Sequence, residues 1–234
     1  MADRVERRIT GVLGALTVTS GVVDAVSFLA LGHAFAALAT GNLLLLAFGI
    51  AGTQGLPVGR PALALAGFLL GATAAHAVIA RRLAVGRRWF TTGLLLEAAM
   101  VGAGGGYALA TGGTAVPTGG HATVVSLLLT FAMGWRSRVV FQTRIPEMPT
   151  TLAQQTLIKL IATLAPPHAA PGGGGLTRVQ RLTTVLGMFV GGLVGAAALP
   201  AGPGVVLLAE AACVAAVAVV YAREPQLRPP APAV

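Results

Sequence analysis

Long apolar runs, separated by short breaks rich in glycine, proline and arginine, make up most of this 234-residue chain. Stretches of about 20 apolar residues are long enough to cross the hydrocarbon core of a bilayer as helices. The pattern therefore predicts an all-α integral membrane protein with a single transmembrane domain over residues 1–234. The runs fall at roughly 9–31, 35–52, 61–80, 91–111, 120–140, 148–164, 182–199 and 204–222.

Two of these runs are poor membrane spans. The run 35–52 contains Thr40-Gly41-Asn42, and 148–164 contains Gln154, Gln155 and Lys159. If both runs enter and leave the bilayer on one face, Arg60 is the only arginine of an outer loop, whereas eight full spans would remove the arginine bias that orients membrane proteins. We therefore predict about six transmembrane helices plus two re-entrant or broken half-helix segments, with the N-terminus and the C-terminus both cytoplasmic.

Composition and charge support the membrane assignment. The chain is 55% hydrophobic and only 10% charged, whereas soluble domains carry about 25% charged residues. The net charge of +9 comes from arginines in short clusters between the apolar runs, as in membrane orientation signals. Nucleic-acid binding would need a basic face interleaved with aromatic residues, so the predicted partner is the lipid bilayer and not a nucleic acid. The single cysteine, Cys213, excludes an internal disulfide.

The two halves of the chain resemble each other. The segment LLLEAAMVGA (94–103) matches LLAEAACVAA (207–216), which places Glu97 opposite Glu210 at an offset of about 113 residues. Likewise, GFLLGATAA (67–75) matches GMFVGGLVG (187–195). An odd number of spans in each half inverts the second half, as in many secondary transporters, whose binding sites lie where the two repeats meet. We predict an inverted repeat with halves of about 9–111 and 120–222.

Polar residues inside the apolar runs are the candidates for a central site. Asp24 lies inside the first run, where a carboxylate usually faces a cavity or a partner. It aligns with Ser137, and Thr40-Gly41-Asn42 aligns near Gln154-Gln155. These residues could also be structural, with Asp24 in a satisfied pair or a helix cap and the tripeptide only breaking and capping a half-helix. The predicted substrate- or ion-binding set is Asp24, Ser27, Thr40, Gly41, Asn42, Gln154 and Gln155.

Three charged residues inside the apolar runs have two interpretations each. Glu97 and Glu210 are either proton carriers or hydrogen-bonded structural acids that hold neighbouring helices. Arg136, like Arg138, is interpreted as a marker of the cytoplasmic end of its span, with its stem snorkelling toward the surface; the other interpretation is that Arg136 binds substrate. The four histidines show no metal-ligand spacing, so we predict neither a metal site nor a cofactor.

The first two runs carry a resemblance to a known family. The stretch SGVVDAVSFLALGHAFAALATGNLLLL (20–46) resembles the N-terminal signature of the YoaK family, bacterial multi-pass membrane proteins of unknown function. The resemblance implies a cytoplasmic (inner) membrane location and this architecture, but no substrate. The second half departs from the family pattern at Gly134-Trp135-Arg136-Ser137 and Gln154-Gln155-Thr156, which implies a ligand different from that of typical members.

The inverted repeat with polar breaks at matching places predicts a secondary transporter or permease for an unidentified small solute. A non-transporting membrane scaffold or sensor subunit is the alternative. No Gly-x-Ser-x-Gly or His-Glu-x-x-His motif is present, which argues against an enzyme. Glycines four residues apart let helix backbones approach closely; we interpret them as packing within the monomer in preference to a homodimer interface.

Overall fold

The computed structural model of the chain describes residues 2–84, 89–142 and 175–223. These residues form helices joined by turns, without strands, and six of the helices are long and apolar enough to cross a membrane. The predicted all-α membrane class is confirmed, whereas the segment 148–164 lies outside the described residues. The helices are α1 (Ala2–Ala30), α2 (Ala39–Ile50), α3 (Gly59–Ala84), α4 (Trp89–Gly112), α5 (Gly119–Phe141), α7 (Gly175–Ala198) and α8 (Pro203–Arg223), with a 3-10 turn, η1, at Leu199–Ala201.

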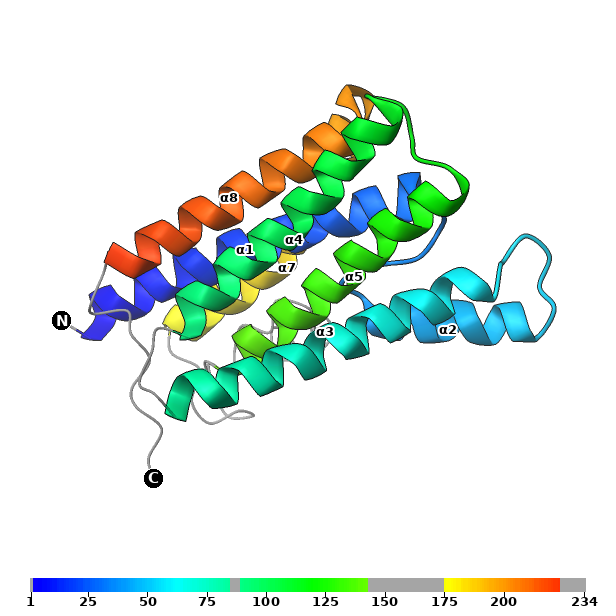
Figure 1. Cartoon of the computed structure of the whole chain (residues 1–234). Coiled ribbons are helices and arrows are strands. Elements are labelled where there is room, and N and C mark those ends of the chain that lie inside the picture. The colour runs from blue at the N-terminus through cyan, green and yellow to red at the C-terminus, as the bar shows by residue number, and fades with distance from the viewer. Residues whose placement is uncertain (1, 85–88, 143–174, 224–234) are drawn as a thin grey trace.

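The short helix α2 explains the polar break in the second apolar run. Thr40-Gly41-Asn42 lies in its first turn and does not interrupt it. With 12 residues it is about 18 Å long at 1.5 Å per residue, well short of the roughly 30 Å hydrocarbon core. It runs beside the first part of α3 and ends near the point where α3 begins (Figure 1). The chain therefore enters and leaves this part of the bundle at one end, as predicted for a re-entrant segment.

The six long helices pack as two interleaved halves. Helix α1 of the first half packs against α7 of the second half, and α5 of the second half packs in the same way against α3 of the first. The equivalent helices α4 and α8 pack against each other. The N-terminus and the end of α8 lie at the same end of the bundle, here called the terminal end (Figure 1). The opposite end, called the loop end, contains the end of α1 and the α4–α5 connection (Figure 1). From there the loop 31–38 runs back along α1, where Ala34 meets Ser27 and Ala37 meets Asp24. The first part of α1 and the last part of α3, which lie at the terminal end, contain arginines at positions 4, 7, 8, 81 and 82. Those near the end of α5, the start of α7 and the end of α8 are at positions 138, 178, 181 and 223, whereas Arg60 is the second residue of α3.

Close helix crossings repeat the same contacts in both halves. A Cβ on Gly21 of α1 would collide with the backbone oxygen of Met188 in α7, and a Cβ on Gly134 of α5 would collide with that of Phe68 in α3. The two glycines are 113 positions apart, which is the offset between the matching segments 94–103 and 207–216. The two carbonyl residues are 120 positions apart, which is the offset between 67–75 and 187–195. Because α1 and its equivalent α5 run in opposite directions along the bundle, the two halves form the inverted repeat that the sequence predicts.

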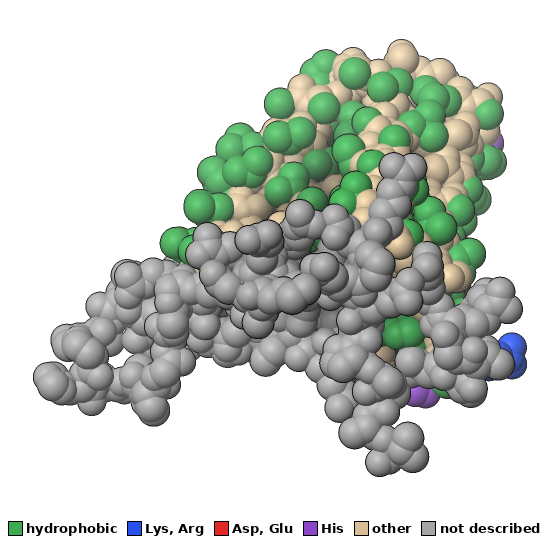
Figure 2. Space-filling view, turned by 90° about the vertical axis from the view of Figure 1, so that its left-hand side faces the viewer, with side chains coloured by type: hydrophobic (Ala, Val, Ile, Leu, Met, Phe, Trp, Pro, Cys, Tyr) green, Lys and Arg blue, Asp and Glu red, His purple; other side chains and the backbone are tan. Residues whose placement is uncertain are grey.

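The outer surface is apolar. In Figure 2, the described part of the visible face is green and tan, and the few blue and purple atoms lie toward its right-hand and lower edges. Leucines and phenylalanines of α3 and α7 are among the most exposed, including Leu69, Phe189 and Leu193. An exposed apolar band of this extent is unfavourable in water and is accounted for by contact with lipid.

Cysteine labelling tests the orientation. In a Cys213→Ser background, we expect Ala84→Cys at the end of α3 to react with a membrane-impermeant thiol reagent from the same side as a cysteine placed at Ala2. Val116→Cys, in the α4–α5 connection, should react only from the other side, because α4 crosses between them. The arginine bias predicts that the first side is cytoplasmic. Labelling of positions 84 and 116 from one side would contradict the six-span arrangement.

Candidate functional site

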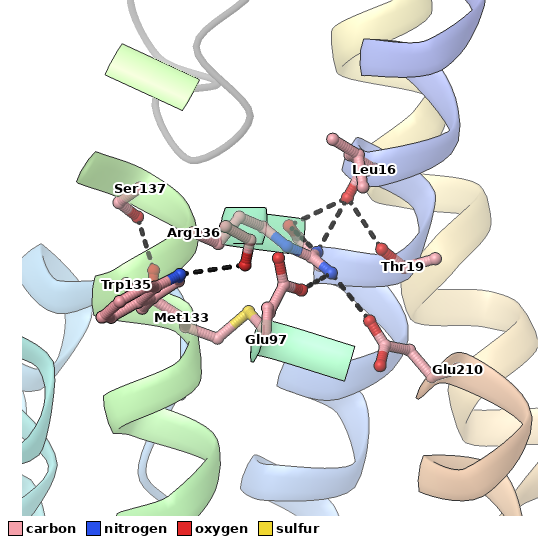
Figure 3. Close-up of polar contacts among 10 residues, drawn as sticks. Leu16, Thr19, Glu97, Met133, Trp135, Arg136, Ser137 and Glu210 are labelled. Atoms are coloured by element: carbon pink, nitrogen blue, oxygen red, sulfur yellow. Dashed lines mark hydrogen bonds and ion pairs between the residues drawn. The ribbon is translucent and has the colours of Figure 1, made fainter. Parts of the chain in front are cut away.

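A buried ion-pair cluster lies between α1, α4, α5 and α8 (Figure 3). Arg136 of α5 has no exposed surface. Its Nη1 donates to the backbone oxygen of Leu16 at 3.0 Å and to Ser20 Oγ at 2.9 Å. Its Nη2 donates to Glu210 Oε1 at 2.8 Å and forms an ion pair with Glu97 Oε1. We call Glu97, Arg136 and Glu210 the triad.

The interpretation of Arg136 as a snorkelling end marker is wrong. Arg136 lies five residues before the end of α5, and it faces α1, α4 and α8 and not the membrane surface. A buried guanidinium is tolerated here because two carboxylates and two further acceptors surround it. Arg138 does lie at the helix end, where it donates to Gln142 Oε1 and contacts His76 Nδ1. The sequence did contain a signal: Glu97 and Glu210, both inside spans, require a cation within the membrane.

The triad lies at the meeting point of the two repeats. Glu97 and Glu210 are equivalent residues of the two halves, and one arginine contacts both. The position equivalent to Arg136 in the first half is Val23, so the guanidinium is a departure from the repeat. Ser20, its hydroxyl partner, is the middle residue of the 21-residue span Thr10–Ala30. The cluster therefore lies inside the membrane-spanning lengths of these helices and not at their ends.

Two apolar clusters flank the triad, one toward each end of the bundle. The terminal cluster packs residues such as Leu94, Ala98 and Val214 on the side where α1 begins. The loop cluster packs residues such as Val101, Leu207 and Ala211 on the other side. The repeat exchanges the two clusters, because each of these residues in one cluster has its equivalent in the other. The equivalent pairs are Leu94 and Leu207, Ala98 and Ala211, Val214 and Val101, Leu16 and Leu129, and Val139 and Val26.

Three of the predicted site residues hold the loop 31–38 in place. Asp24 Oδ1 accepts a hydrogen bond from the Ala37 amide at 2.7 Å. Ser27 Oγ donates to the Ala34 oxygen at 2.7 Å. Asn42 both accepts from the Phe35 amide at 2.8 Å and donates to the Phe35 oxygen at 2.6 Å. Non-helical backbone inside a membrane protein needs such partners, because lipid offers none.

The other predicted site residues that the structure describes, Thr40 and Gly41, form none of these hydrogen bonds. Thr40 is exposed on α2. Gly41 lies against the Leu38 and Phe35 side chains, each 3.0 Å from the position that a Cβ would occupy. Gln154 and Gln155 lie outside the described residues. Ser20 and Asp24 are one helical turn apart on α1, so the same face of α1 contacts the triad and the loop 31–38.

Replacing Asn42 tests the role of this loop. We expect Asn42→Ala to lower the free energy of unfolding by about 1–3 kcal/mol, because both backbone groups of Phe35 lose their partner in a partly buried setting. Thr40→Ala, two residues earlier on the exposed face of α2, should change it by less than about 0.5 kcal/mol. Denaturant titration in detergent micelles measures both. Equal stability of the two variants would show that Asn42 does not hold the loop.

The fold and the buried cluster define a class: a multi-pass helical membrane protein built as an inverted repeat around an intramembrane ion-pair cluster. The chain belongs to the family described as "Protein of unknown function (DUF1275)", which matches residues 12–221. This match confirms that the chain belongs to a family of unknown function, as the resemblance in its first two apolar runs implies. No curated protein and no solved structure matches the chain.

Proposed function

We propose that the protein is a secondary transporter, or permease, for a small solute, and that the triad is the centre of its transport site. The proposal depends mainly on one observation: two apolar clusters, exchanged by the inverted repeat, close a charged centre from opposite ends. Inverted-repeat transporters use this relation to open a fixed central site alternately to the two sides. We assign the protein to the bacterial cytoplasmic membrane, with both termini in the cytoplasm.

The charged centre is what favours transport over a purely structural bundle. A charged side chain in the middle of a membrane costs at least about 2.5–3.5 kcal/mol, and a core of the same volume made of apolar residues is often as stable as a buried ion pair or more so. Glu97, Arg136 and Glu210 are therefore unfavourable choices if stability is their only role. In this proposal, the buried triad corresponds to a closed state of the transport cycle, in which water from neither side of the membrane reaches the three side chains.

Alternating access can be tested without knowing the solute. In a Cys213→Ser background, Ala98→Cys and Ala211→Cys place equivalent thiols in the terminal cluster and the loop cluster. We expect a small water-soluble thiol reagent to modify Ala98→Cys from the terminal side and Ala211→Cys from the loop side, in intact proteoliposomes of known orientation. Both alanines are 7% exposed, so a static bundle would protect both.

The same experiment separates transport from the alternative. A non-transporting scaffold or sensor subunit would leave both cysteines protected, whereas modification of one alone would indicate a fixed cavity open to one side. A panel of amino acids, carboxylic acids, amines and sugars, screened by thermal shift, then identifies candidate solutes. Stabilisation by a true solute should be lost in Glu210→Gln and kept in Arg138→Lys.

A further inference from the structure

The triad has an unequal charge count. One guanidinium lies between two carboxylates, and all three side chains are at most 3% exposed. If both glutamates are ionised, the cluster carries one uncompensated negative charge away from water. Such a charge is far more costly than the same charge in solution, and proteins usually neutralise it. A second positive species is therefore needed beside Arg136.

The described side chains around the triad do not supply this second cation. From α1, Leu16, Thr19 and Ser20 face the cluster, and the acidic Asp24 lies one turn further along. Arg136 comes from α5, and the charged groups that α4 and α8 bring to it are the acids Glu97 and Glu210. Arg138, although on the same helix, contacts Gln142 and His76 at the helix end. Among the described residues, the triad's cation is Arg136 alone.

A metal ion fits this cluster poorly. Within the described part of the chain, no group of three or more histidine, cysteine, aspartate or glutamate side chains is placed to hold one. Both glutamates direct Oε1 to the same nitrogen, Nη2 of Arg136, so the space between them already holds positive charge. A proton needs no coordination shell and can bind directly to a carboxylate oxygen.

The two glutamates differ in how well they are satisfied. Glu210 Oε1 accepts a hydrogen bond from Arg136, and Thr19 lies beside the same carboxylate. Glu97 has the ion-pair contact, but neither of its carboxylate oxygens has a hydrogen-bond partner among the described residues. Oε2 of Glu210 also lacks a partner there, so the difference is the hydrogen bond to Glu210 Oε1, which makes Glu97 the less satisfied of the two carboxylates. An unpartnered carboxylate oxygen without solvent is the position where a bound proton lowers the free energy most.

We propose that Glu97 carries one exchangeable proton, and that this proton is the coupling ion of the transport site. The inference rests on the proposed function for its coupling role, but the bound proton itself does not depend on transport. When one apolar cluster opens, the O–H bond of Glu97 breaks and the proton passes to water, leaving a carboxylate on Glu97. When the other cluster opens, that carboxylate takes a proton from water and the triad is neutral again.

Infrared spectroscopy of the reconstituted protein tests for the proton directly. We expect a carbonyl stretch of a protonated carboxylic acid at neutral pH, which Glu97→Gln removes and Asp24→Asn leaves in place. Because Glu97→Gln could fail to fold, wild-type protein with 13C-labelled glutamate and unlabelled aspartate gives a second measurement. The label should shift the band, and raising the pH should abolish it.

Three results would overturn the proposal. They are the absence of a glutamic-acid band at neutral pH, a band that survives in Glu97→Gln, and stabilisation of the wild type by sodium chloride but not by choline chloride. The outcome is independent of the thiol-accessibility experiment. If the Glu97 band is present but both cysteines are protected, the bound proton is supported and the transport function is rejected. If both cysteines are modified from opposite sides but the band is absent, the transport function is supported and the bound proton is rejected.

Discussion

Replacing Arg136 by methionine is expected to lower the free energy of unfolding by about 3–5 kcal/mol, because it leaves the buried Glu210 carboxylate, and Glu97 whenever it is ionised, without a cation. The guanidinium also donates to the Leu16 oxygen and to Ser20 Oγ, and both acceptors lose this donor. The effect should be visible as a large shift of the unfolding midpoint in a denaturant titration in mixed micelles. Arg138→Met removes an arginine two positions further along, near the helix end, and should cost less than about 1 kcal/mol.

A compensated variant separates the charge from the shape of the core. Glu97→Leu and Glu210→Leu, combined with Arg136→Met, replace all three ionic groups with apolar ones, and we expect this triple variant to recover most of the stability lost in Arg136→Met. It should nevertheless fail to bind any solute found by thermal shift. If the free energy of unfolding of Arg136→Met alone is within about 1 kcal/mol of that of the wild type, the triad is not the charged core described here.

The architecture could be predicted from the sequence because hydropathy, arginine positions and repeat offsets are one-dimensional signals. Run lengths indicate the six long helices, and the glycine-containing break marks α2. The offset of 113 pairs Glu97 with Glu210, and the fold places these two residues around one guanidinium. Each of these features depends on spacing along the chain and not on which way a helix is turned.

The role of Arg136 could not be predicted because it depends on how α5 is rotated about its axis. Helix α5 is apolar around most of its circumference, so periodicity does not show which face is turned inward. Arg136 and Arg138 therefore look equivalent in the sequence, although one is fully buried and the other lies at the helix end. The sequence likewise shows that Asp24 needs a partner, but not that the partner is the amide of Ala37, 13 residues later.

Substitutions at the helix crossings should be nearly as severe, and their pattern tests the inverted repeat. A Cβ on Gly191 would collide with the backbone oxygen of Val18, and a Cβ on Gly71 would collide with that of Phe131. Since a backbone carbonyl cannot turn away as a side chain can, each glycine-to-alanine change forces two helices apart. We expect each to cost about 1–3 kcal/mol.

The neighbouring residue Gly192 provides the matched control. A Cβ there would meet nothing within 4 Å, so Gly192→Ala should be neutral or stabilise by up to about 1 kcal/mol through its effect on the unfolded chain. Because Gly71 and Gly191 occupy equivalent crossings of the two halves, their losses should be similar. A loss at Gly192 as large as that at Gly191 would show that the carbonyl collision is not the cause, and strongly unequal losses at Gly71 and Gly191 would show that the two crossings are not equivalent. The two apolar clusters would then not open as equivalent gates, since the helices that carry them would pack differently in each half.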